Sequence, residues 1–165
     1  FLTPYIGRYK EAGANGVIMA EPLAGLLSPE LAREFSADYV RQIVENVQDE
    51  EFMVIYHNCG DNVLQMTDSI AQTKAAAFHF GNSISMRDML EALPGDRLVM
   101  GNLDPTGQIR NGTPQSVKEQ TRRIMEECCG YRNFVISSGC DIPPGSRWEN
   151  IDAFFEAVKE FYDEA

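Results

Sequence analysis

Long apolar runs are missing from this sequence. No stretch of about 18 uninterrupted apolar residues occurs, so no membrane-spanning helix is predicted. The first ten residues lack the basic start and apolar centre of a secretory signal, and a cytoplasmic protein is expected. In that reducing compartment the four cysteines are more typical of metal binding, catalysis or packing than of disulfide bonds.

Positive charge is also scarce. The chain carries 14 Lys and Arg residues against 25 Asp and Glu residues, which gives a formal net charge of -11. Binding to nucleic-acid phosphates or to anionic membrane surfaces needs clustered Lys and Arg. Neither nucleic acid nor a membrane is therefore expected as a partner.

The glycine-rich phosphate-binding motifs G-x-G-x-x-G and G-x-x-x-x-G-K-[ST] are absent as well, which disfavours a nucleotide-binding open sheet. Present instead is an alternation of short apolar runs and longer helical patterns. The runs predict strands at Gly16–Ala20, Phe52–Tyr56, Ala75–Phe80, Leu98–Gly101 and Phe134–Ser138. The remaining patterns predict helices at 1–12, 29–46, 63–72, 86–93, 114–129 and 151–162.

The predicted strands are continuously apolar, which is typical of a parallel sheet buried on both faces. One α/β domain, residues 1–165, is expected. Its strand–helix units fit either an open doubly wound sheet or part of a (β/α)8 TIM barrel. A complete barrel needs about 250 residues, and the chain does not begin with Met. We therefore expect a fragment of a longer protein.

Three metal-binding side chains follow predicted strands, where ligands bind in both architectures. His57 and Cys59 come after the second strand, and Cys140 comes after the last. An imidazole and two thiols supply three ligands and leave one position free, as in a catalytic zinc site. The alternative is a buried histidine with two cysteines that serve only packing.

Further polar residues at the strand ends are candidates for the same site. Glu21 is a candidate fourth zinc ligand or substrate-binding residue. Asp104 is a candidate acceptor that orients His57, with a plain turn residue as the alternative. His79 lies inside a strand and is interpreted as a hydrogen-bonded core histidine, and Trp148 as a packing anchor. The predicted substrate-binding set is Glu21, Asn82, Asn102, Asp104 and Ser138.

Two thiolates would give a bound zinc ion more negative charge than imidazoles alone. Such a site generates hydroxide poorly and is better suited to hold a substrate thiol as thiolate at neutral pH. The ligand set therefore favours alkyl transfer to sulfur.

Three longer motifs resemble the uroporphyrinogen decarboxylase superfamily. They are Glu-Pro-Leu-Ala-Gly-Leu-Leu-Ser-Pro at 21–29, Gly-Asn-Leu-Asp-Pro at 101–105 and Ser-Gly-Cys-Asp-Ile-Pro-Pro at 138–144. The resemblance extends over essentially the whole chain. It implies the C-terminal part of that family's (β/α)8 barrel.

The ligand residues distinguish two branches of this superfamily. The decarboxylases carry a motif similar to Gly-His-Gly where this chain has Ser138-Gly139-Cys140. The His57-x-Cys59 pair with Cys140 resembles instead the cobamide-dependent methyltransferases of the methylcobalamin:coenzyme M type. That resemblance implies zinc on these three residues, a methyl-corrinoid donor carried by a separate corrinoid protein, and a small thiol acceptor.

Two alternatives stay open at this point: a metal-free uroporphyrinogen decarboxylase, and a non-catalytic corrinoid- or metal-binding relative. Half a barrel also leaves two sheet edges and an apolar face uncovered. We expect either a second half of the same protein or a homodimer formed through these edges.

Overall fold

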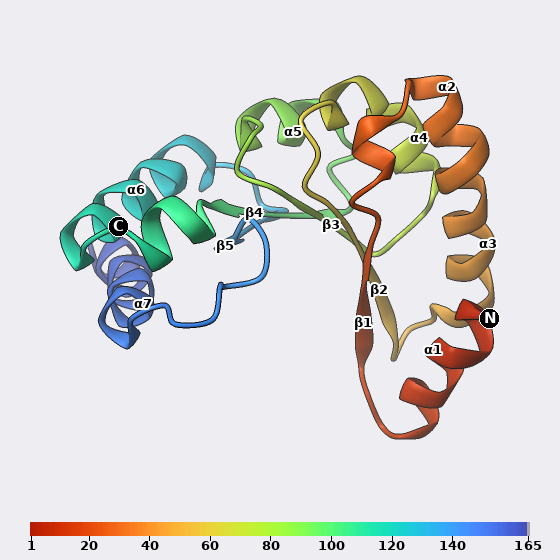
Figure 1. Ribbon diagram of the computed structural model, residues 1–165, viewed down its shortest axis with the longest axis horizontal. Coiled ribbons are helices and arrows are strands. Elements are labelled where there is room, and N and C mark those ends of the chain that lie inside the picture. Colours follow the sequence, from red (N-terminus) through yellow and green to blue (C-terminus); the bar gives the residue numbers. More distant parts are fainter. Residues whose placement is uncertain (165) are drawn as a thin grey trace.

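The computed structural model describes residues 1–164, which form a curved, five-stranded parallel sheet (Figure 1). The strands are β1 (Gly16–Ala20), β2 (Met53–Asn58), β3 (Ala77–Phe80), β4 (Leu98–Leu103) and β5 (Phe134–Ser138). Each strand is hydrogen-bonded to the next one along the chain, in the order β1-β2-β3-β4-β5. Parallel strands that follow one another in chain order, with helices between them, form part of a (β/α)8 barrel. The predicted fold class is confirmed.

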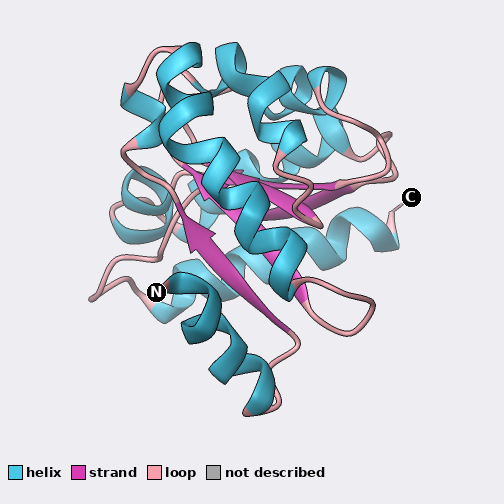
Figure 2. Ribbon diagram, turned by 90° about the vertical axis from the view of Figure 1, so that its right-hand side faces the viewer, coloured by secondary structure: helices cyan, strands magenta, loops and turns pink. Residues whose placement is uncertain are grey.

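Helices cover the outer, convex side of the sheet, as the turned view shows (Figure 2). The α-helices are α1 (Leu2–Glu11), α2 (Pro29–Ala32), α3 (Asp38–Val47), α4 (Thr67–Gln72), α5 (Met86–Ala92), α6 (Pro114–Cys128) and α7 (Trp148–Asp163). Shorter turns are η1 (Ala24–Leu26), η2 (Arg33–Ala37), η3 (Val63–Met66) and η4 (Pro105–Arg110), of which η2 and η4 are π-helical. Within residues 1–164 no helix combines the length and apolar character needed to cross a membrane.

Local sequence determines where helices α2 and α6 begin. The side chains of Ser28 and Thr113 accept hydrogen bonds from the backbone amides of Leu31 and Ser116. A proline follows each cap and suits the first helical position, because its missing N–H would have no partner there. The predicted starts of both helices are confirmed.

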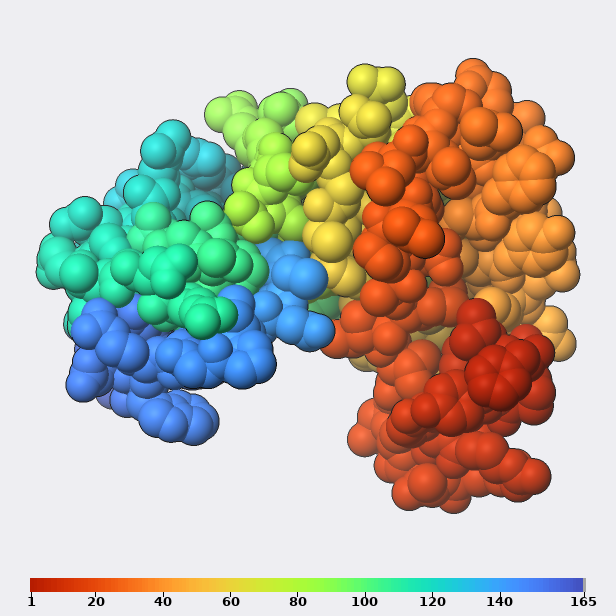
Figure 3. All heavy atoms as spheres, in the orientation of Figure 1, coloured from red at the N-terminus to blue at the C-terminus, as the bar shows by residue number. Residues whose placement is uncertain are grey.

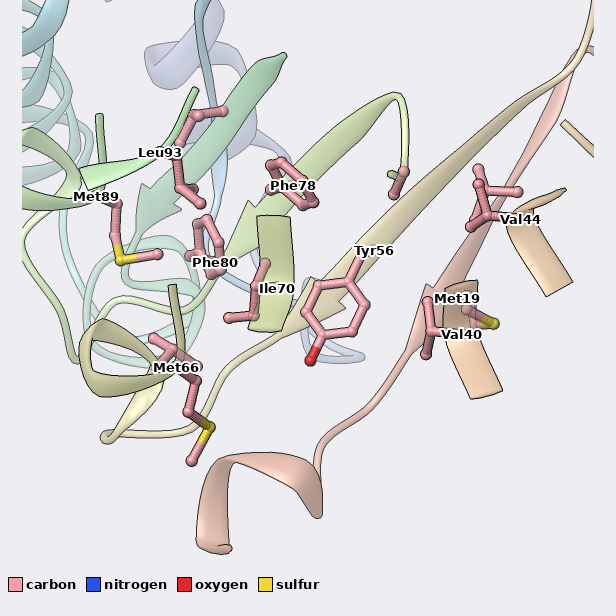
Figure 4. Packing of buried hydrophobic residues seen from close by; sticks show 14 of the residues in the cluster. Met19, Val40, Val44, Tyr56, Met66, Ile70, Phe78, Phe80, Met89 and Leu93 are labelled. Atoms are coloured by element: carbon pink, nitrogen blue, oxygen red, sulfur yellow. The ribbon is translucent and has the colours of Figure 1, made fainter. Parts of the chain in front are cut away.

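The main hydrophobic core fills the space between the sheet and the outer helices (Figure 4). Tyr56, Phe78 and Phe80 point into it from the strands, and Val40 and Ile70 from the helices. Because successive side chains of a strand point to opposite faces, the residues between these positions point to the concave side. His57 and His79 are two of them, and they pair across β2 and β3.

The concave side of the sheet is open, and the space-filling view shows a hollow between the N-terminal and C-terminal ends of the chain (Figure 3). Ile18 on β1 is 65% exposed there. Within residues 1–164, β1 and β5 each have a strand partner on one side only. Both features were expected for part of a barrel.

One sequence interpretation is wrong. Trp148 is 77% exposed at the start of α7, so it is not a packing anchor among the described residues. The structure also contains a π-helical turn at Pro105–Arg110, a segment for which the sequence predicts no element. Its Pro and Gly residues have turn chemistry, which conceals a helical segment this short.

Candidate metal centre

His57, Cys59 and Cys140 come together at the carboxyl ends of β2 and β5. Their ligand atoms all lie within 4.8 Å of one another. Cys140 Sγ is 3.5 Å from His57 Nε2. His57 is buried and both cysteines are half-buried, and Cys140 lines a cleft on the concave side. The structure therefore brings together the three residues that the sequence predicted as a zinc site.

The donor set and its spacing fit zinc. In a tetrahedral site, Zn–S bonds of about 2.3 Å and Zn–N bonds of about 2.0–2.1 Å place neighbouring sulfur and nitrogen ligands about 3.6 Å apart. The observed 3.5 Å between Cys140 Sγ and His57 Nε2 matches this separation. Thiolate and imidazole ligands favour zinc over magnesium or calcium.

Burial shifts the pKa values of His57 and Cys59 in the metal-free protein. It lowers the pKa of His57, although a hydrogen bond to the His79 carbonyl and the charge of Asp141 oppose this. Burial also raises the pKa of the Cys59 thiol, and the neighbouring Cys140 raises it further. A neutral imidazole and a protonated Cys59 thiol are therefore favoured near pH 7 until a metal displaces the thiol proton.

Asn58 fixes the turn that carries Cys59. This fully buried side chain accepts a hydrogen bond from the Gly60 amide at 2.9 Å and donates one to the Tyr56 hydroxyl at 3.1 Å. A Cβ on Gly60 would lie 2.5 Å from the Cα of Gly25. Only glycine allows the loops after β1 and β2 to pack this closely, and their contact holds Cys59 at the strand end.

Glu21 lies at the end of β1, next to the cluster but outside it. Its amide donates a hydrogen bond to the His57 carbonyl at 2.8 Å. Its carboxylate Oε2 accepts one from Ser36 Oγ at 2.7 Å. Ser36 is buried in the π-helical turn η2. This turn therefore determines where the Glu21 carboxylate points.

The predicted polar substrate residues have different environments. Asn102 is buried, and its amide nitrogen donates to the carbonyls of Gly81 and Ile84, both at 2.8 Å. It therefore ties the loop after β3 to β4. Ser138 donates to the Cys140 carbonyl at 2.8 Å and so supports a metal ligand. Asn82 is exposed and lines a pocket of about 550 Å³ beside α6.

The predicted role of Asp104 as the acceptor that orients His57 is wrong. Its Oδ1 accepts hydrogen bonds from the amides of Thr106 and Gly107, at 2.9 Å and 2.8 Å. Asp104 thus caps η4, because its short side chain reaches the free amides of its own turn before anything across the barrel.

His79 is the contact of His57 that sequence reasoning missed. His79 Nδ1 lies 2.7 Å from His57 Nδ1, and the His79 carbonyl lies 3.2 Å from the same nitrogen. Both rings line a cleft of about 280 Å³ that also includes Cys140 and Asp141. The side chain is hydrogen-bonded, as expected, but it faces the site rather than the core. The contact follows from the strand register, which places His79 directly opposite His57, and the sequence carries no signal of that register.

Comparison with known proteins identifies the family to which this sequence is similar. The family model described as uroporphyrinogen decarboxylase (URO-D) matches residues 1–161. The chain belongs to this family. Its curated relatives include both decarboxylases and methyltransferases. Members of the family are therefore enzymes, but membership alone does not distinguish between these two reactions.

A uroporphyrinogen decarboxylase from Prochlorococcus marinus is 30% identical over 158 residues, covering 94% of this chain and 43% of that protein. A methylated-thiol–coenzyme M methyltransferase from Methanosarcina mazei is 28% identical over 150 residues, covering 90% and 38%. A methylcobamide:CoM methyltransferase from Methanosarcina acetivorans is 24% identical over 165 residues, covering 98% and 46%. The chain spans less than half the length of each.

The solved structure of a methyltransferase from Methanosarcina mazei aligns with a TM-score of 0.85 and 23% identity. The alignment covers 97% of this chain and 46% of the other. This match supports the partial-barrel fold alone.

Proposed function

We propose that this protein is a zinc-dependent methyltransferase that moves a methyl group from a methyl-corrinoid to a thiol. The observation that carries the proposal is the cluster of one imidazole and two thiols, with Cys140 at the end of β5. Two relatives are named for coenzyme M, and one of them also for methylcobamide. A small thiol of the coenzyme M type, a corrinoid protein as donor and a cytoplasmic location go with this proposal.

A zinc ion at this site would keep a bound thiol deprotonated at neutral pH. A thiolate held there would be placed to accept a methyl group from a methyl-corrinoid, a transfer that would form a carbon–sulfur bond, break the carbon–cobalt bond and leave its electron pair on the corrinoid. His57, Cys59 and Cys140 would hold the zinc ion, and the fourth position would be open to the substrate thiol. Glu21 is the proposed ligand of that position when no thiol is bound, which requires its carboxylate to turn from Ser36 towards the cluster.

The concave cleft suits a small acceptor. Apolar side chains of Ile55, Met100 and Ile142 line it together with His57 and Cys140. Low polarity beside the ligands strengthens the interaction between the reacting charges, because fewer water molecules screen them.

The second candidate is a uroporphyrinogen decarboxylase. The 30% identity to a decarboxylase favours it, since this exceeds the identity to either methyltransferase. A decarboxylase that needs no metal, however, leaves two convergent thiols beside a buried imidazole without a role. The cluster is therefore the reason to prefer thiol methylation.

Methyl transfer from methylcobalamin to coenzyme M tests the proposal directly, with loss of the methyl–cobalt absorbance as the measurement. We expect about one zinc ion per chain and thiol-dependent demethylation. Cys59→Ser and Cys140→Ser should lose both, and Cys129→Ser should retain both because this exposed thiol lies outside the cluster. Metal-free protein that decarboxylates uroporphyrinogen would instead establish the second candidate.

A further inference from the structure

A series of hydrogen bonds runs across the concave side from His57 on β2, through His79 on β3, to the end of β5. His57 Nδ1 contacts His79 Nδ1 at 2.7 Å. His79 Nε2 contacts the Ser138 carbonyl at 2.8 Å and Ser137 Oγ at 3.0 Å. The proposed methyl transfer assigns no role to His79, although it touches a proposed ligand directly.

The contacts of His79 with Ser137 and Ser138 determine which ring nitrogen of His79 carries the proton. A backbone carbonyl can only accept, so the 2.8 Å contact with Ser138 requires a proton on His79 Nε2. Ser137 Oγ donates its own proton to the same carbonyl at 3.1 Å, and its lone pair can accept from His79. In a neutral imidazole with Nε2–H, Nδ1 carries the lone pair. A charged His79 would be unfavourable beside a bound divalent cation.

The contacts of His57 agree with this assignment, and its contact with the His79 carbonyl does so independently. His57 Nδ1 faces two acceptors, the His79 carbonyl at 3.2 Å and the His79 Nδ1 lone pair at 2.7 Å. Both require a proton on His57 Nδ1, which leaves the lone pair of Nε2 directed at Cys140 Sγ, 3.5 Å away. That is the tautomer that can bind a metal through Nε2.

We infer that His79 is a positioning residue that holds His57 in its metal-binding tautomer through the Nδ1–Nδ1 hydrogen bond. The inference deepens the proposed function and rests on it for the identity of the metal. A histidine ligand commonly donates its other ring N–H to a carboxylate or carbonyl. Here a second imidazole accepts in addition to the His79 carbonyl, and its orientation is set by Ser137 and Ser138 of β5.

A pair of amide substitutions separates the two hydrogen bonds of His79. In His79→Asn, the side-chain oxygen occupies the region of Nδ1 and can still accept from His57. In His79→Gln, the amide reaches the region of Nε2 and can still donate to Ser138, but a methylene group faces His57. The two variants are similar in polarity and differ in which bond they preserve, so each serves as the control for the other.

Two measurements test the inference. Nitrogen-15 NMR of the histidine rings in metal-free protein reports the tautomers, and competition with a chromophoric chelator reports the zinc affinity. We expect native His57 protonated on Nδ1 and His79 on Nε2. His79→Gln should weaken zinc binding about tenfold, at the low end of the range for such partners because the His79 carbonyl remains, and His79→Asn by less than about threefold.

A native His57 protonated on Nε2 would overturn the inference, as would equal zinc affinities of the Asn and Gln variants. These outcomes are distinct from failure of the proposed function. Protein that binds zinc and methylates thiols with the opposite tautomer would retain the function and reject the role of His79. Protein with the expected tautomers but no zinc binding would reject the proposed function and retain the hydrogen-bonding role of His79.

Discussion

Cys140 Sγ lies 3.5 Å from His57 Nε2, although β3 and β4 separate their strands in the sheet. Three strand spacings in a flat sheet would place β2 and β5 about 14 Å apart. The curvature of the sheet and the inward reach of both side chains close that distance. The metal centre therefore depends on the barrel shape, and changes that flatten or shift the strand ends should weaken it.

Gly81 offers a direct test of this dependence. A Cβ at this position would lie 2.8 Å from both Cα and Cβ of Cys59, so Gly81→Ala must push the ligand away. We expect a loss of about 1–3 kcal/mol in the free energy of unfolding from overpacking, together with weaker zinc binding. Gly95→Ala is the matched control, because no atom lies within 4 Å of its Cβ. Urea denaturation measures the free energy of unfolding, and chelator competition measures the zinc affinity. Equal zinc affinities for the two variants would contradict the expectation.

Asp104 should matter for stability and not for zinc. Asp104→Ala removes the acceptor for the amides of Thr106 and Gly107. The expected cost is about 1 kcal/mol of unfolding free energy, the usual value for loss of a capping side chain. Asp96→Ala provides an exposed comparison with little expected effect. A drop in zinc affinity of Asp104→Ala without loss of stability would restore the role that its sequence position indicated.

Much of the fold could be predicted because each strand is a compact apolar run. The predicted bounds of β1 and β5 match the observed ones. The π-helical turn η2 could not be predicted, since a hydrophobic stripe with helical spacing continues through it from α2 into α3. Its consequence, Ser36 directed at the Glu21 carboxylate, was therefore also hidden.

The convergence of His57, Cys59 and Cys140 could be predicted, whereas the contacts that support these residues could not. Their common location could be predicted because functional residues of parallel sheets lie at the carboxyl ends of the strands. The partner of His57 depends on strand register, which pairs His57 with His79 and leaves Asp104 to its own turn. Sequence order alone carries no such register information.

The metal-free protein should lose stability as the pH falls below about 6.5, the ordinary pKa of histidine. Burial lowers the pKa of both His57 and His79. The unfolded chain therefore binds protons first, so the stability due to these groups is present above that pH and is lost towards their folded pKa values. Urea denaturation in chelator at pH 7, 6 and 5 measures this. His79→Asn should show a shallower loss, and slopes as steep as in the native protein would contradict the prediction.

Zinc binding should release protons and become tighter as the pH rises. Burial and the neighbouring Cys140 raise the pKa of the Cys59 thiol, so this group is protonated near pH 7 and must lose its proton to bind metal. His57 contributes no proton there, because its pKa is lowered and Nε2 is already free. Calorimetric titration in two buffers of different ionisation enthalpy counts the protons released. Cys59→Ser should reduce that count along with the affinity, whereas a native count of zero at pH 7 would show that Cys59 is already a thiolate.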